Sequence, residues 1–248
     1  MAGPQTPPAA ATSAASIAFR RIRTGNAFEE CVERLLQSVT LGLVEPGQRL
    51  PAERDLAARL GVGRETLREA IRELAAAGWL ESRRGRHGGT FVLDRAGTHT
   101  ARRAAPPAAP SRAELDDVLV LRRALEVGAA SAAAAAEVPP SERAALQGLL
   151  TECRCAEPAR YRPADSRLHL AIAAMAGSPS LTAAVADVRM RVNLLLDAIP
   201  LLERNIAHSN TQHAKVVRAV VRRNPAQAGA AMDEHLAGSA ALLRGFLG

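Results

Sequence analysis

From Arg112 to Gly248 the apolar residues recur at helical spacing, and prolines or glycines interrupt the pattern repeatedly. The interruptions fall at Pro139-Pro140-Ser141, Glu157-Pro158, Gly177-Ser178-Pro179, Ile199-Pro200 and Asn224-Pro225. They leave six or seven helices and no run that alternates like a strand. Because aromatic residues make up only 2% of the chain, the core has to be built from Ala, Leu and Val, which favour helix packing. We therefore expect an antiparallel helical bundle here.

The first hundred residues predict a different unit. Helical spacing from Phe28 to Val39 indicates one helix, and two more are expected over Glu53–Leu60 and about Arg64–Ala77, each stopped by a glycine. Residues Trp79–Arg83 alternate like a strand, glycines then permit a tight turn, and Thr90–Leu93 return. Two helices with a short glycine-containing turn, followed by a hairpin, are typical of a winged helix-turn-helix.

Composition divides the chain into four segments. Residues 1–24, rich in Pro, Ala, Ser and Thr, predict a disordered tail, and residues 25–97 hold the winged helix-turn-helix. A proline- and alanine-rich linker over 98–112 leads to the helical domain at 113–248, which we expect to bind an effector and to dimerise. The expected fold class is mainly α.

Charge and cysteine content narrow the partners and the compartment. The net charge of +7 and the isoelectric point near 10.7 suit a polyanionic partner. Cys31, Cys153 and Cys155 are too few and too badly spaced for a disulfide framework, which indicates a reducing cytoplasm. No apolar run reaches the roughly 18 residues of a membrane span, so no membrane partner is expected.

The third predicted helix carries two rows of charge. One row is basic: Arg64, Arg68 and Arg72. The other is acidic: Glu65, Glu69 and Glu73. Arginines in such a row can contact phosphates or the guanine edge in the major groove, whereas alternating rows are also found on solvated helices laced by ion pairs. The hairpin favours the DNA-binding interpretation, because basic residues at its tip can reach phosphates or the minor groove; they are Arg83, Arg84, Arg86 and His87.

In the second half, four polar residues interrupt apolar helix faces. Asp165 and His169 are four residues apart and share one face. His213 and His235 each lie eleven residues from Asn224, the expected helix cap, so in an antiparallel hairpin they stand at the same level, about 16 Å from the turn. Three imidazoles and a carboxylate make a metal site that suits Zn²⁺, Ni²⁺, Mn²⁺ or Fe²⁺. The alternative is a set of hydrogen-bonded core residues.

Residues 43–92 closely resemble the DNA-binding domain of GntR-family bacterial transcription regulators, through LVEPGQRLPAERDLAARLGVGRETLREAIRELAAAGWLESRRG and GGTFV. The resemblance implies that Arg54 contacts the DNA backbone or a base. It implies that Arg64 and Arg68 read the major groove while Thr66 binds a phosphate.

The same resemblance places Arg84 and Gly85 at the wing tip, near the minor groove. Two positions depart from the family pattern. Gly63 stands where the family usually has a Ser or Thr cap, and Glu65 stands where a small or polar residue often faces the bases. A carboxylate at Glu65 repels phosphate but can accept a hydrogen bond from cytosine N4, so the operator sequence is left open.

The helical half resembles the FCD effector domain of FadR-like GntR regulators. Its metal-binding motif matches Asp165-Ser166-Arg167-Leu168-His169, His213, and Met232-Asp233-Glu234-His235. The resemblance implies a divalent metal at these four ligands and an effector-facing arginine, Arg122, in Arg122-Arg123-Ala124-Leu125-Glu126. The alternative for Arg122 is a surface pair with Glu126. Arg191 and Asn193 are further effector-binding candidates, on a helix that could line the same cavity.

These features predict a ligand-responsive transcription regulator and not an enzyme. We expect a repressor that binds a pseudo-palindromic double-stranded DNA operator as a homodimer and responds to a small carboxylate effector. It would be cytoplasmic in a bacterium, and nucleoid-associated when bound to DNA. A metal-dependent hydrolase or lyase is disfavoured because the chain has no HExxH motif, nucleophile elbow or P-loop. A constitutive architectural DNA-binding dimer, with a purely structural helical domain, is the remaining alternative.

Overall fold

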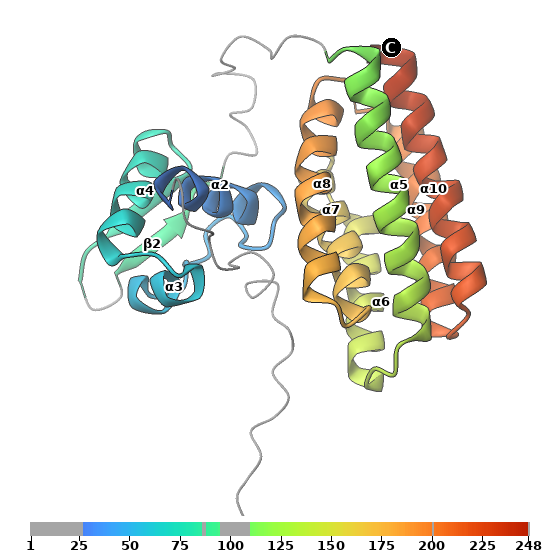
Figure 1. Ribbon diagram of the computed structural model, residues 1–248, viewed down its shortest axis with the longest axis horizontal. Coiled ribbons are helices and arrows are strands. Elements are labelled where there is room, and N and C mark those ends of the chain that lie inside the picture. The colour runs from blue at the N-terminus through green and yellow to red at the C-terminus, as the bar shows by residue number, and fades with distance from the viewer. Residues whose placement is uncertain (1–26, 86–87, 95–109, 200, 248) are drawn as a thin grey trace, which may run out of the picture.

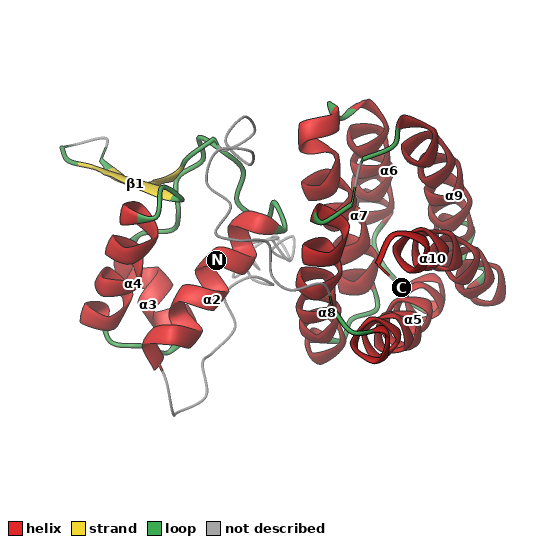
Figure 2. Ribbon diagram, turned by 90° about the horizontal axis from the view of Figure 1, so that it is seen from above, coloured by secondary structure: helices red, strands yellow, loops and turns green. Residues whose placement is uncertain are grey.

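The computed structural model describes residues 27–85, 88–94, 110–199 and 201–247. A small N-terminal unit carries the described strands, and a larger C-terminal unit is built of helices (Figure 1, Figure 2). The expected fold class, mainly α with a winged helix-turn-helix and a helical bundle, is confirmed. The predicted tail at 1–24, residues 98–109 of the predicted linker, and the wing residues Arg86 and His87 lie outside the described residues.

The N-terminal unit follows the predicted order of elements. It consists of α2 (Ala27–Thr40), α3 (Glu53–Leu60), α4 (Arg64–Ala76), β1 (Leu80–Arg83) and β2 (Gly89–Val92). The strands pair antiparallel, with the first residue of β1 opposite the last of β2. This hairpin is the wing that the glycine-rich stretch predicted.

Helix α4 is held on the core by one face only. Leu67, Ile71 and Leu74 are buried, so the opposite face is left to solvent. The turn before α4 contains Gly61 at a φ of 70°, a left-handed conformation that glycine adopts without strain. Gly63 is the N-cap of α4 and supplies no side-chain hydrogen bond, which costs only a few tenths of a kcal/mol relative to a serine or threonine cap, by order of magnitude.

Six helices form the described part of the C-terminal unit. They are α5 (Arg112–Ala135), α6 (Pro140–Cys155), α7 (Pro158–Met175), α8 (Pro179–Asp197), α9 (Glu203–Val221) and α10 (Pro225–Leu247). Four of them begin at a proline, because the first helical position has no N–H bond to lose. The five predicted interruptions all fall between these helices, so the bundle prediction is confirmed.

One face of helix α5 packs into the bundle, and the other is exposed. The helix contacts α7, α8, α9 and α10, and the second half of its buried face is alanine, which allows close approach of its neighbours. Polar residues on this inner face therefore lie inside the bundle. None of the described helices is both long and apolar enough to serve as a transmembrane segment.

The two units touch along α2 and the loop that follows it. Arg34 Nη1 and Gln37 Nε2 of α2 both donate to Asp187 Oδ1 of α8, at 2.7 and 3.0 Å. Arg167 Nη1 of α7 donates to the backbone oxygen of Gly42 at 3.2 Å. Helices α7 and α8 therefore carry the contacts between the bundle and the winged helix-turn-helix.

Candidate metal centre and nucleic-acid interface

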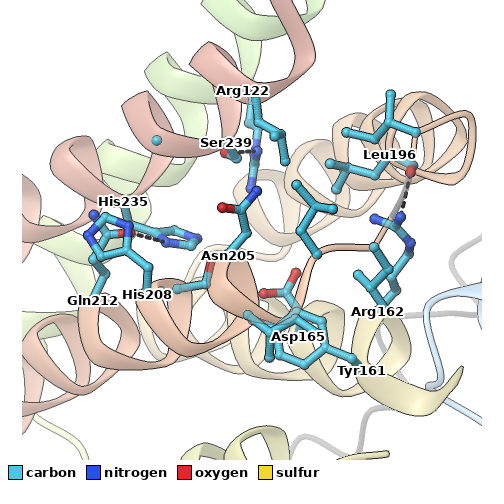
Figure 3. Close-up of a pocket in the computed structure, with 17 residues that line it drawn as sticks. Arg122, Tyr161, Arg162, Asp165, Leu196, Asn205, His208, Gln212, His235 and Ser239 are labelled. Carbon is cyan, nitrogen blue, oxygen red and sulfur yellow. Dashed lines mark hydrogen bonds between the residues drawn. The ribbon is translucent and has the colours of Figure 1, made fainter. Parts of the chain in front are cut away.

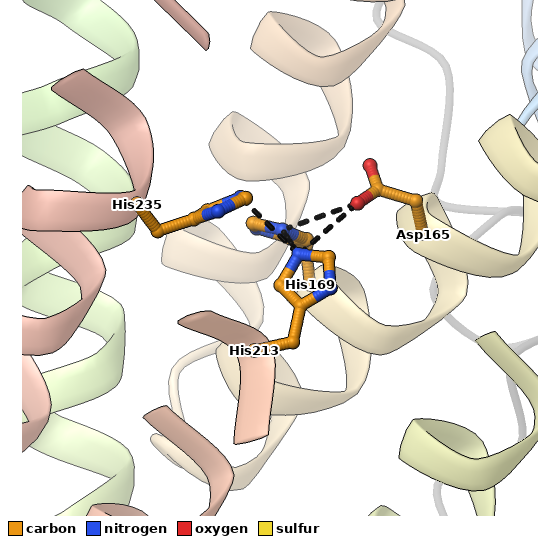
Figure 4. A group of neighbouring side chains, drawn as sticks. All are labelled: Asp165, His169, His213 and His235. Carbon is orange, nitrogen blue, oxygen red and sulfur yellow. Dashed lines mark hydrogen bonds and ion pairs between the residues drawn. The ribbon is translucent and has the colours of Figure 1, made fainter. Parts of the chain in front are cut away.

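Four side chains predicted as metal ligands meet in the core of the bundle (Figure 4). Asp165 and His169 lie one turn apart on α7, His213 lies on α9 and His235 on α10. His213 and His235 lie at the same level because each is eleven residues from Asn224, the cap of α10. Asn224 Oδ1 accepts a hydrogen bond from the backbone N–H of Gln227 at 3.0 Å. All four side chains are buried.

The potential ligand atoms are close enough to share one ion. Nε2 of His213 lies 3.2 Å from Nε2 of His169 and 3.2 Å from Nε2 of His235. Asp165 Oδ1 lies 3.2 Å from His213 Nε2 and 3.7 Å from His169 Nε2. Metal–nitrogen bonds of about 2.1 Å, at tetrahedral or octahedral angles, place neighbouring ligand atoms roughly 3.0–3.4 Å apart. Three of the four spacings lie in this range, and all four ligand atoms lie within 4.8 Å of one another, so small side-chain adjustments would let them share one ion.

The second ring nitrogen of each histidine, Nδ1, faces a partner on another helix. The pairs are His169 with Glu126, His213 with Cys153 Sγ at 4.0 Å, and His235 with Gln212 Oε1 at 3.3 Å. A carboxylate or amide oxygen accepts a hydrogen bond, so it keeps the imidazole proton on Nδ1 and the lone pair on Nε2. Lone pairs that converge in this way repel one another unless a cation lies between them. The donor set therefore fits a divalent metal but does not choose among Zn²⁺, Ni²⁺, Mn²⁺ and Fe²⁺.

Asp165 is held from behind by Arg189, a fully buried arginine of α8. The guanidinium donates to Asp165 Oδ2, and at 3.1 Å to Ser166 Oγ. Burial alone would raise the pKa of Asp165, but Arg189, His169 and His213 hold that pKa well below its usual value. The carboxylate is therefore ionised, and its Oδ1 is turned toward the histidines.

A second buried ion pair supports the site from α5. Arg122 Nε donates to Glu126 Oε1 at 2.9 Å, and the side chains are 3% and 1% exposed. Burial would raise the pKa of Glu126, but Arg122 and His169 hold it below its usual value. The alternative of a surface pair between Arg122 and Glu126 is wrong, because both side chains lie on the face of α5 that packs into the bundle.

Two of the three histidines, His169 and His235, are held in the neutral form that binds metal. Burial lowers the pKa of His169, and burial together with the neighbouring His213 lowers the pKa of His235 well below its usual value. Glu126, although its charge opposes the effect, does not reverse it at His169. Neutral imidazoles at neutral pH need lose no proton to coordinate a cation.

A cavity of about 230 Å³ opens beside the metal site (Figure 3). Asp165 and His235 form part of its wall, and Arg122 reaches it from α5. Arg122 Nη1 donates to Ser239 Oγ at 2.8 Å. Pockets for drug-sized ligands are about 300–1,000 Å³, so this cavity suits a smaller molecule.

Two of the three residues predicted to bind an effector do not line this cavity, as far as the described residues show, and Arg122 is the third. Arg191 is exposed and pairs with Asp117 at 3.0 Å. A step of two residues along a helix rotates the side-chain direction by about 200°. Arg191 therefore points outward, because Arg189 points inward. Asn193 is buried, but its Nδ2 donates to Ser166 Oγ on the far side of Asp165. The placement of Arg191 and Asn193 in the cavity is corrected accordingly.

The sequence did not predict the roles of two residues at the site, Arg189 and Glu126. Arg189 lies between two other charged residues of α8, Asp187 and Arg191, so the sequence does not mark which of the three is buried. Its pairing with Asp165 becomes visible only in the structure. Glu126 was seen only as a partner of Arg122, and its contact with His169 depends on the packing of α5 against α7.

The predicted DNA-binding residues are accessible. The exposed ones are Arg54, Arg64, Glu65, Arg68, Arg84 and Gly85, and Thr66 is half-buried. Arg68 Nε donates to Glu53 Oε2 at 2.7 Å, which links α4 to α3. Gly85, with a φ of 105°, turns the chain at the end of β1. Because these residues are already accessible, they can contact another molecule without disturbing the packing that stabilises the fold.

Comparison with known proteins agrees with both halves of this description. The profile of the gntR family, described as bacterial regulatory proteins, matches residues 28–92, and the profile of the FCD domain matches residues 117–238. A protein of Mycobacterium gastri, provisionally named HTH-type transcriptional regulator RmpR, is 35% identical over 211 residues, which span 83% of this chain and 76% of that protein.

Two further proteins are similar. A protein of Escherichia coli strain K12, provisionally named L-lactate dehydrogenase operon regulatory protein, is 36% identical over 149 residues, or 58% of this chain and 57% of that protein. The structure of E. coli McbR/YncC shares the fold, with a TM-score of 0.55 at 18% identity over 91% of this chain and all of that one. The relatives are regulators and not enzymes, and the chain belongs to the GntR family of DNA-binding transcription regulators, with an FCD domain as its C-terminal half.

Proposed function

We propose that this regulator is a repressor that binds a pseudo-palindromic operator as a homodimer and releases it when a small carboxylate enters the FCD domain. A cytoplasmic protein, nucleoid-associated when bound to DNA, fits this role. A dimer presents two recognition helices to two half-sites, so the operator repeats with the symmetry of the protein.

The exposed face of α4 is assigned to base reading. Arg64 and Arg68 would enter the major groove, with Glu65 able to accept from cytosine, while Thr66 contacts a phosphate. Arg54 of α3 would contact the backbone or a base. Arg84 and Gly85 would approach the minor groove at the wing, where contacts discriminate sequence least.

The metal is assigned to Asp165, His169, His213 and His235. Two buried arginines, Arg122 and Arg189, balance two buried carboxylates, Glu126 and Asp165, around the three imidazoles. A divalent ion, when bound, supplies positive charge that this neutral set does not cancel, which favours an anionic ligand in the adjoining cavity.

A carboxylate is the anion that the cavity fits best. Arg122 lines the wall beside Asp165 and His235, and a guanidinium held by Glu126 and Ser239 is a fixed donor for a carboxylate. The E. coli relative is named for a lactate dehydrogenase operon, and lactate is itself a small hydroxycarboxylate.

The contacts between the units offer a path from the cavity to the DNA-binding domain. Arg167 lies between the ligands Asp165 and His169 on α7 and donates to Gly42, and Asp187 lies two residues before Arg189 on α8 and accepts from α2. A ligand that moves α7 or α8 therefore changes the seating of the winged helix-turn-helix. It can do so only through a difference in affinity for the two arrangements.

The observation that carries the proposal is the convergence of three Nε2 atoms and Asp165 Oδ1 at the wall of a cavity that also presents Arg122. The test begins with operator selection from random DNA. Operator affinity of the Zn²⁺-loaded protein is then measured with saturating lactate, malate or citrate. Release of the operator by a carboxylate that binds is expected. Unchanged affinity with an occupied site would favour the constitutive DNA-binding dimer.

A further inference from the structure

The cavity beside the metal site has a charged inner end and a group of aliphatic side chains toward its mouth. The inner end contains Arg122, Asp165 and His235. The outer end contains aliphatic side chains from three helices and a connecting loop: Leu196, Ile199, Leu201, Leu202, Ile206 and Leu242. Polar side chains of α7 and α9 also line the cavity: Tyr161, Arg162, Asn205, His208, Ser209 and Gln212. A doubly charged acid would need a second cationic partner besides Arg122, because a charge left without a partner is costly.

The numbering shows why the aliphatic end lies directly beyond the metal level. Leu196 is seven residues after Arg189 on α8, Ile206 is seven residues before His213 on α9, and Leu242 is seven residues after His235 on α10. Seven residues are about two helical turns, so each aliphatic side chain lies on the same face as its polar counterpart, about 10 Å along the helix. Because neighbouring helices run antiparallel, all three steps lead to the same end of the bundle.

The charged residue nearest that end is engaged elsewhere. Arg162 Nη2 donates to the backbone oxygen of Leu196, and its Nε pairs with Asp197 at 2.9 Å (Figure 3). Leu201 and Leu202, 38% and 41% exposed, lie where the α8–α9 connection borders the cavity. Exposed leucines at such a place gain by contact with an apolar ligand.

We propose that the effector is a monocarboxylate with an apolar tail, held with its acid group at the Arg122 end and its tail against Leu196, Ile206 and Leu242. This inference rests on the proposed function and narrows its ligand class. At about 30 Å³ for each water-sized group, 230 Å³ holds roughly eight non-hydrogen atoms. A carboxylate with a 2-hydroxyl and about three to five further carbons has that size, by the same volume estimate.

The test is isothermal titration calorimetry of the full-length, Zn²⁺-loaded protein with four acids: lactate, 2-hydroxybutyrate, 2-hydroxyhexanoate and malate. Each added methylene is expected to raise the affinity about fourfold, if it becomes fully buried. Malate, which ends in a second carboxylate, is expected to bind more weakly than 2-hydroxybutyrate.

Matched variants locate the tail. Ile206→Thr is expected to reduce the affinity ratio of 2-hydroxyhexanoate to lactate by several-fold, whereas Leu194→Thr, at an exposed leucine of α8 outside the cavity, keeps the ratio of the parent. If Ile206→Thr fails to fold, Leu202→Gln, at a partly exposed position of the mouth, replaces it with the same expectation.

The outcomes separate the two proposals. An affinity that is flat or falls from lactate to 2-hydroxyhexanoate, or tighter binding of malate, would overturn the apolar tail while leaving the carboxylate site intact. Failure of all four acids to bind would overturn the carboxylate effector itself. Loss of the chain-length effect in Leu194→Thr as well as in Ile206→Thr would remove the tail from this end of the cavity.

Discussion

Replacing Glu126 by glutamine should loosen the metal and destabilise the fold together. The carboxylate accepts from Arg122 at 2.9 Å and is paired with Nδ1 of His169, with only 1% of its side chain exposed. Glutamine keeps the size but removes the charge, so Arg122 loses its buried counter-ion. His169 also loses the partner that fixes its proton on Nδ1.

The magnitude follows from the two lost contacts. Removing the carboxylate partner of a metal-binding histidine typically lowers metal affinity about 10–100-fold, or roughly 1.4–2.8 kcal/mol. Removing one partner of a buried ion pair costs roughly 3–5 kcal/mol of folding free energy. The second cost is present without metal, and the first appears only in the metal-bound protein.

Chelator competition and denaturant unfolding, with and without Zn²⁺, measure the two costs separately. The control is Asp233→Asn, which breaks the exposed Arg123–Asp233 pair between the same helices, α5 and α10. An exposed pair contributes about 0–1 kcal/mol, so little change is expected. If Glu126→Gln behaved like Asp233→Asn in both assays, the supporting role of Glu126 would be refuted.

Three further predictions address DNA reading, communication and pH. Arg68→Ala should weaken operator binding by about 1–3 kcal/mol and relax preference at one base pair, as measured by fluorescence anisotropy on matched operators; equal losses on every sequence would make Arg68 a phosphate contact. Arg167→Ala should leave metal content unchanged but reduce the effect of an effector on operator affinity, whereas Arg244→Ala, which breaks an exposed pair with Asp116 within the bundle, should retain it. Because the pKa values of His169 and His235 are lowered by folding, the unfolded chain binds more protons below about pH 6.5, and the metal-free protein should lose stability as pH falls through that value. Stability that rises on acidification in urea titrations from pH 8 to pH 5 would contradict the burial of neutral histidines.

Local signals predicted the helix boundaries and the four candidate ligands. Proline at the first helical position and Asn224 at a cap act within a few residues, so their effect is readable without the fold. The equal spacing of His213 and His235 from Asn224 then fixed their level, because a helix advances by a constant rise.

Tertiary packing decided what the sequence left open. Whether Arg189 or Arg191 faces inward depends on the rotation of α8 about its axis, and the local sequence, which also contains Asp187, does not determine that rotation. Glu126 and His169 are forty-three residues apart in the chain, and they come into contact only because α5 lies against α7. Pairings of this kind arise only once the helices have packed.

The metal content per chain, measured by elemental mass spectrometry on protein purified without a metal-affinity tag, tests the site directly. The His213→Ala variant is measured in the same way. We expect about one transition metal ion per chain in the parent protein, bound by the four-ligand set, and loss of metal and thermal stability together in the variant. A parent protein that contains no metal, and takes up none when Zn²⁺, Ni²⁺, Mn²⁺ or Fe²⁺ is added, would contradict the assignment of Asp165, His169, His213 and His235.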